Sequence, residues 1–116
     1  MVIEYGLGAD METFELDLLA IVRQCEQTYF SGIKPISSAD FDPCLDGPSR
    51  FLPELNRIEV KACFALFQKL CRLLVLHELI HKKLYGKFGK VQSDSGNEFL
   101  AEVKLLWDCG AYRGLL

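Results

Sequence analysis

Apolar residues recur at helical spacing in three stretches of the chain. In residues 11–29 they return every three or four positions after Asp10, the expected N-cap, which predicts an amphipathic helix. Residues 61–85 contain no proline or glycine and are mostly apolar, so we expect a long, largely buried helix that ends at Gly86. A third amphipathic helix is predicted over residues 97–109.

Strand signals are short and lie between these helices. Residues 2–5 alternate loosely, and residues 56–60 alternate clearly just before the long helix, so each predicts a short strand. Residues 31–56 hold all four prolines and are expected to be mainly loop, with an extended piece at 33–36. The pattern predicts one α+β domain over residues 1–116, with a long N-terminal helix, a small sheet, a buried helix and a following helix.

Composition and charge exclude several classes of function. The net charge is −3 and the pI is about 5.3, so a broad basic surface and nucleic-acid binding are not expected. The apolar runs are too short for a membrane span, and the N-terminus lacks the pattern of a signal peptide. The five cysteines have no C-x-x-C spacing, which indicates reduced thiols and a cytoplasmic location.

The long helix carries the motif His77-Glu78-Leu79-Ile80-His81, which contains the only two histidines of the chain. Residues four apart lie on one helix face, about 5–6 Å between Cβ atoms, so both imidazoles can reach one zinc ion. The carboxylate of Glu78 then lies beside the metal, where this chemistry needs a general base that takes a proton from an activated water. The motif therefore predicts a zinc cofactor, His77 and His81 as ligands, and Glu78 as the catalytic base.

A catalytic zinc usually has three protein ligands and one open position. Because no third histidine exists, the third ligand must be a carboxylate, a thiolate or absent. The following helix offers Glu98 and Glu102, one turn apart, and the loop before it offers Asp94. The residues alone leave these alternatives open.

The motif at 77–81 followed by residues 97–102, Asn-Glu-Phe-Leu-Ala-Glu, resembles the gluzincin zinc metallopeptidases. That resemblance implies a zincin-like fold in which the helix that carries the histidine motif is followed by a helix that carries a glutamate ligand. It also implies that Glu98 is the third ligand. Glu102 would then orient a ligating histidine without binding the metal itself.

Two other families look similar in the same region. Residues 95–99 are similar to a segment of SprT-like proteases, in which the third metal ligand lies at the position of Ser95. Because serine is a poor zinc ligand, this resemblance implies either that a carboxylate has replaced the third ligand or that the metal has been lost. The chain also resembles phage-repressor-cleaving metallopeptidases, which have an Asn-x-Phe-x-Ala-Glu segment near this point. Their ligand glutamate lies a few residues before the Asn of that segment, where this chain offers only Asp94. The positions that match are Asn97, Phe99, Ala101 and Glu102.

The function expected is zinc-dependent hydrolysis of a peptide or protein substrate. An oxyanion partner is expected as well, with Tyr112 as the candidate and Tyr85 or Arg113 as alternatives. The other hypothesis is a catalytically degenerate module that keeps the fold but only binds or regulates. The small size leaves little room for a cleft, so a protein partner or a second copy of the chain is a candidate to complete it.

Overall fold

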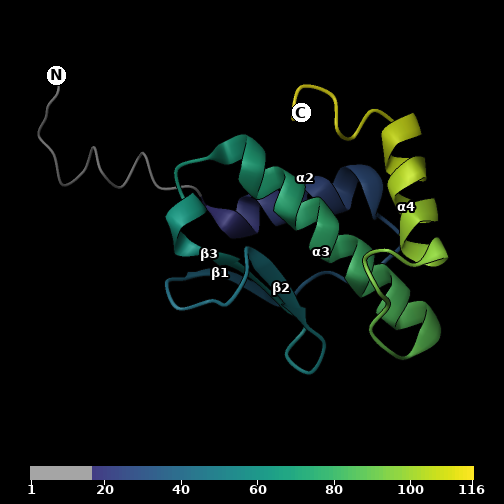
Figure 1. Ribbon diagram of the computed structural model, residues 1–116, viewed down its shortest axis with the longest axis horizontal. Helices are drawn as coiled ribbons and strands as arrows, with labels where there is room; N and C mark the ends of the chain where they lie inside the picture. The colour runs from purple at the N-terminus through teal and green to yellow at the C-terminus, as the bar shows by residue number, and fades with distance from the viewer. Residues whose placement is uncertain (1–16) are drawn as a thin grey trace, which may run out of the picture.

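The computed structural model describes residues 17–116 (Figure 1). The strand predicted at 2–5, the Asp10 cap and the helix start at residue 11 lie outside these residues. The described part is a mixed α+β structure, which confirms the predicted class. Its elements are α2 (Leu18–Tyr29), β1 (Ser38–Asp42), β2 (Ser49–Leu52), β3 (Arg57–Lys61), a 3₁₀ turn (Ala62–Phe64), α3 (Gln68–Phe88) and α4 (Asn97–Asp108).

The three strands form a mixed sheet with β3 in the centre, parallel to β1 and antiparallel to β2. Ile58 and Val60 of β3 are fully buried in the core that α2 and α3 complete. Glu59 alternates to the opposite face, where it accepts hydrogen bonds from Arg50 and Arg57. The helices therefore cover one face of the sheet, as Figure 1 shows, and ion pairs cover the other.

Most of residues 31–56 is loop and turn, as predicted, but the segment also contains the two strands β1 and β2, which were not predicted. The extended piece expected at 33–36 forms no strand. Proline removes a ladder donor and is excluded from strand interiors, yet it is compatible with strand ends. All four prolines lie just outside the strands: Pro35 and Pro43 flank β1, and Pro48 and Pro53 flank β2.

The first helix ends where predicted, at Tyr29, and α2 itself begins at Leu18. Asp17 has an extended backbone, and its side chain accepts a hydrogen bond from the Ala20 amide at 3.2 Å. This capping geometry places the start of α2 at Leu18.

Both predicted ends of the long helix are wrong. Lys61 pairs with Asp42 as the last residue of β3, and the 3₁₀ turn then separates the strand from α3. Gly86 lies inside α3, and Gly89, with φ of 73°, ends the helix in the left-handed conformation. The third helix agrees with its prediction to within one residue at the C-terminus.

α3 is the central element, because it packs against the sheet, α2 and α4. Its inward face consists of fully or nearly fully buried apolar residues: Cys71, Val75, Leu76, Leu79, Ile80 and Leu84. None of the helices within residues 17–116 is long and apolar enough to cross a membrane.

Candidate metal centre

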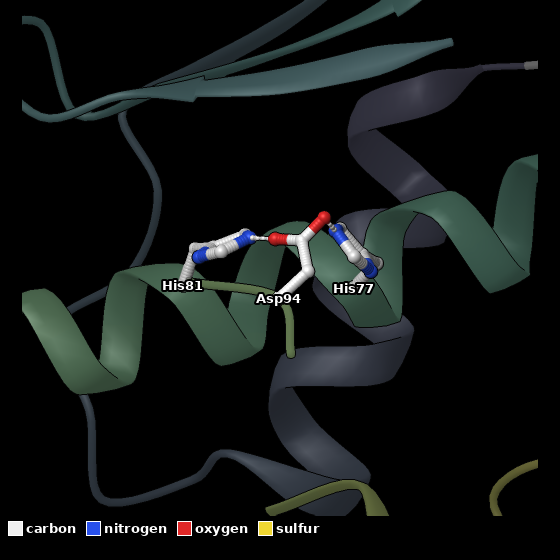
Figure 2. A group of neighbouring side chains, drawn as sticks. All are labelled: His77, His81 and Asp94. Atoms are coloured by element: carbon white, nitrogen blue, oxygen red, sulfur yellow. Dashed lines mark hydrogen bonds and ion pairs between the residues drawn. The ribbon is translucent and has the colours of Figure 1, made fainter. Parts of the chain in front are cut away.

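His77 and His81 lie one turn apart on α3 and direct their rings to the same carboxylate (Figure 2). The His81 Nε2 atom lies 2.6 Å from Asp94 Oδ1, and His77 Nε2 lies 3.4 Å from Asp94 Oδ2. The three candidate ligand atoms all lie within 4.8 Å of one another. This cluster, His77, His81 and Asp94, is the candidate metal centre.

The loop between α3 and α4 brings Asp94 over the two histidines. After Gly89 ends α3, the chain turns back and forms a tight turn before α4, in which the Gly96 amide donates to the Ser93 carbonyl at 3.1 Å. The Ser95 amide donates to the Ser93 hydroxyl oxygen at 3.2 Å. The Asp94 side chain stays 66% exposed at the top of this turn, so one side of the cluster is open to solvent.

Phe99 of α4 packs against both imidazole rings. Its ring centroid lies 4.8 Å from that of His77 and 4.7 Å from that of His81. The Phe99 side chain is buried, so it holds one side of each ring in place and excludes water there. The two ring nitrogens of His81 have different surroundings. The Nδ1 atom is buried without a hydrogen-bond partner in the described residues, whereas the Nε2 atom meets Asp94.

Glu78 is buried beside the cluster, with only 4% of its surface exposed. Burial raises the pKa of its carboxyl group above the ordinary value. The Ser49 hydroxyl, which donates to Glu78 Oε2 at 2.6 Å, lowers this pKa, and so do His77 and the Phe51 amide, but burial dominates. The carboxyl group is therefore a stronger proton acceptor than a solvated glutamate.

These groups face a cleft of about 270 Å³. Residues 49–51 of β2 form one wall, and Val91, Gln92 and Asp94 of the loop form the other. The motif residues of α3, His77, Glu78 and His81, also line the cleft, between these walls. The cleft is thus lined by three elements, namely β2, α3 and the loop before α4.

The chemistry of the donors fits a zinc ion. Two imidazole nitrogens and one carboxylate oxygen are a common ligand set of catalytic zinc, which keeps a fourth position open. Nitrogen and oxygen donors of this kind also suit other divalent transition metals, so the set by itself selects a class of metals. The exposed side of Asp94 leaves room for a further ligand.

The structure groups Asp94, and neither glutamate of α4, with the histidines. Glu98 is exposed in the first turn of α4 and does not belong to the cluster found in residues 17–116. Glu102 instead accepts a hydrogen bond from the Lys83 ammonium at 2.6 Å. Of the three carboxylates that the sequence offered, the geometry favours the one on the loop.

The expected oxyanion partners do not line this cleft. Tyr112 and Arg113 line a separate cavity of about 350 Å³ beside Trp107. Tyr85 packs edge-on against the ring of Phe51, with centroids 6.3 Å apart. Within the described residues, none of the three expected partners therefore lies at the candidate metal centre.

Sequence reasoning missed the roles of Ser49 and Phe99. Ser49 lies in the proline-rich segment that the sequence predicts to be loop, where no pattern separates it from other serines. Phe99 matches the motif of the phage-repressor-cleaving type, but helical spacing alone marks it only as a core residue.

Comparison of this chain with protein-family models, with curated proteins and with solved structures finds no match.

Proposed function

We propose that this protein is a zinc-dependent metallopeptidase whose metal is held by His77, His81 and Asp94. The observation that carries the proposal is the convergence of both histidine Nε2 atoms on the Asp94 carboxylate, beside a buried glutamate in a cleft. When bound, zinc acts as a Lewis acid that polarises a carbonyl group and lowers the pKa of water.

Glu78 is the proton carrier in this proposal. Its carboxylate accepts a proton from the attacking water and returns it to the nitrogen of the leaving amine. Because burial raises the pKa of Glu78, the group is better suited to hold that proton than an exposed glutamate. Phe99 keeps the two imidazoles in place while their Nε2 atoms face the cleft.

A peptide is the substrate class that the cleft favours. In the sheet formed by residues 17–116, β2 is an edge strand, and the Lys61 amide donates to the Pro48 carbonyl at 2.8 Å. In an antiparallel pair, inward and outward backbone groups alternate, so the carbonyls of Ser49 and Phe51 point away from β3. An extended peptide can pair with such an edge, which here forms one wall of the cleft.

The free thiols fit the cytoplasmic location that we include in the proposal. All five cysteines are unpaired, and three of them, Cys44, Cys63 and Cys109, are exposed. Exposed thiols persist in reducing compartments, where disulfides are rare.

A second candidate function is a binding or regulatory module that performs no hydrolysis. The hydrogen bond between His81 and Asp94 at 2.6 Å supports it, because the two groups satisfy each other directly. A cleft of about 270 Å³ is also small for a protein substrate, so a partner or a second copy is proposed to extend it.

Cleavage of an internally quenched peptide library by zinc-loaded protein tests the proposal. We expect the wild type to cleave, and Glu78→Gln to bind zinc equally but lose about 10²-fold or more of the rate, since its side chain cannot take up the proton. Glu98→Gln is the matched control, because it changes an exposed glutamate outside the cluster. Full activity in Glu78→Gln contradicts the proposed base, and an inactive zinc-loaded wild type supports the second candidate.

A further inference from the structure

Ser49 makes the contact that connects the sheet to the motif helix at the cleft. Its hydroxyl donates to Glu78 Oε2 at 2.6 Å, in a partly buried position. The two residues lie 29 positions apart in the chain, so the fold and not local sequence brings them together.

The sheet fixes the position of this hydroxyl. Ser49 opens β2 and pairs with the fully buried Val60 of β3. Immediately before it, the Pro48 carbonyl accepts a hydrogen bond from the Lys61 amide at 2.8 Å. The backbone at Ser49 is therefore held by the central strand.

Alternation along β2 directs the serine side chain to α3. Arg50 points to the opposite face, where its Nε atom donates to Glu59 at 2.6 Å. Ser49 and Phe51 consequently share the face that meets α3, and Phe51 packs against Tyr85 of that helix.

Glu78 needs such an anchor because its side chain has several rotatable bonds. A carboxylate that accepts a directed hydrogen bond on one oxygen has few remaining orientations. With Oε2 held by Ser49, the carboxylate stays beside the two histidines at the cleft.

We propose that Ser49 is a positioning residue of the reaction, whose hydroxyl holds the Glu78 carboxylate in the orientation that accepts the proton. This inference rests on the proposed peptidase function and adds a residue to it. Removing a hydrogen-bonding group that orients a residue of a metal site typically lowers activity by about 10- to 100-fold.

Three variants test this role on a library peptide that the wild type cleaves. Ser49→Ala should bind as much zinc as the wild type, with kcat lowered about 10- to 100-fold and KM within about twofold, because binding does not need the hydroxyl. Ser49→Thr restores the hydroxyl and should recover most of kcat. Ser38→Ala, which removes the serine that opens β1 away from the cleft, should behave like the wild type.

The double variant separates positioning from a general structural role. If Ser49 acts through Glu78, adding Ser49→Ala to Glu78→Gln should cause no further loss of kcat. Wild-type kcat in Ser49→Ala, loss of its zinc, or a further loss in the double variant would overturn the inference.

A readout without substrate distinguishes failure of this inference from failure of the proposed function. Urea unfolding of the wild type, Ser49→Ala, Glu78→Ala and the Ser49→Ala/Glu78→Ala double variant should show that Ser49→Ala lowers the midpoint more when Glu78 is present than in the Glu78→Ala background, because alanine offers no acceptor for the hydroxyl. Equal losses in the two backgrounds would overturn the role of the contact. Absence of cleavage by the zinc-loaded wild type would instead overturn the peptidase function, and the positioning role with it.

Discussion

Asp94 differs from the other residues of the candidate metal centre in its surroundings. His77 and His81 are held by α3 and by the ring of Phe99, and Glu78 is buried, whereas the Asp94 side chain is 66% exposed. Ion pairs at such exposed positions contribute little to stability. The loop geometry around Ser93 and Gly96, more than the charge itself, therefore keeps the carboxylate at the histidines.

Cys25 illustrates a buried titratable residue away from this centre. Burial raises the pKa of its thiol to about 11, a shift that Arg72 partly opposes. In the unfolded chain the thiol ionises near its ordinary pKa of 9.0, before the folded one does. The unfolded state thus loses its proton first, and the free energy of unfolding falls as pH rises from about 9 to about 11.

We expect this contribution to be about 2 kcal/mol over that range. Unfolding in urea at pH 8, 9, 10 and 11 measures it, with Cys25→Ala as the comparison. The variant should be less stable at pH 8 because it leaves a cavity, but its stability should fall less steeply above pH 9. Parallel curves for the two proteins would show that Cys25 ionises equally in the folded and unfolded states.

At the scale of elements, α4 supports the candidate metal centre by packing. Its buried residue Phe99 contacts both imidazoles, while Glu98 beside it faces solvent. In the structure this helix packs Phe99 against the two histidines of the candidate metal centre, and neither of its glutamates belongs to the cluster found in residues 17–116.

Phe99→Ala tests this role of α4. We expect it to lower the free energy of unfolding by about 3–5 kcal/mol, as removal of a buried aromatic ring does, and to weaken zinc binding by freeing the imidazoles. Leu100→Ala is the matched control, because Leu100 is 52% exposed, and it should change stability by about 0.5 kcal/mol or less. Urea unfolding and zinc titration measure both effects; equal stability of the two variants would contradict the packing role.

Local patterns in the sequence predict the helices better than the strands. The 77–81 motif and its helix follow from spacing and from the lack of proline and glycine, which act over a few residues. Lys61 fits the helical pattern equally well, but pairing with Asp42 makes it part of β3. The strands β1 and β2 are only five and four residues long, so the sequence of each carries little signal, and β1 also depends on a partner, β3, that follows after β2 in the chain.

The same distinction applies to the candidate site. Spacing on one helix predicts that His77, Glu78 and His81 lie together, and the structure agrees. The third carboxylate depends on how the loop after Gly89 turns back, which no local pattern fixes. The contact between Ser49 and Glu78 depends on the register of β2 against β3, and is equally invisible in the sequence.

At the scale of the whole molecule, the cleft joins β2, α3 and the loop before α4 into one site. Any ligand that binds only the folded state stabilises the entire structure by mass action. A metal held by residues of α3 and by the loop should therefore oppose unfolding of the domain as a unit.

Zinc should accordingly raise the thermal unfolding midpoint of the wild type. A free concentration of about 100 times the Kd contributes about 2.7 kcal/mol to the free energy of unfolding. His81→Ala removes a proposed ligand, whose side chain is 12% exposed, and should abolish the zinc-dependent shift. An equal shift in wild type and variant would show that zinc binds elsewhere, for instance at the exposed cysteines.

The ligand set itself is tested most directly by the zinc content of two matched variants, Asp94→Ala and Glu98→Ala. Each removes one exposed carboxylate near the start of α4, but only Asp94 meets both histidines. After dialysis against a weak chelator, we expect about one zinc per chain in the wild type and in Glu98→Ala, and little in Asp94→Ala. Zinc retained in Asp94→Ala, or lost in Glu98→Ala, would contradict the metal centre described for this protein.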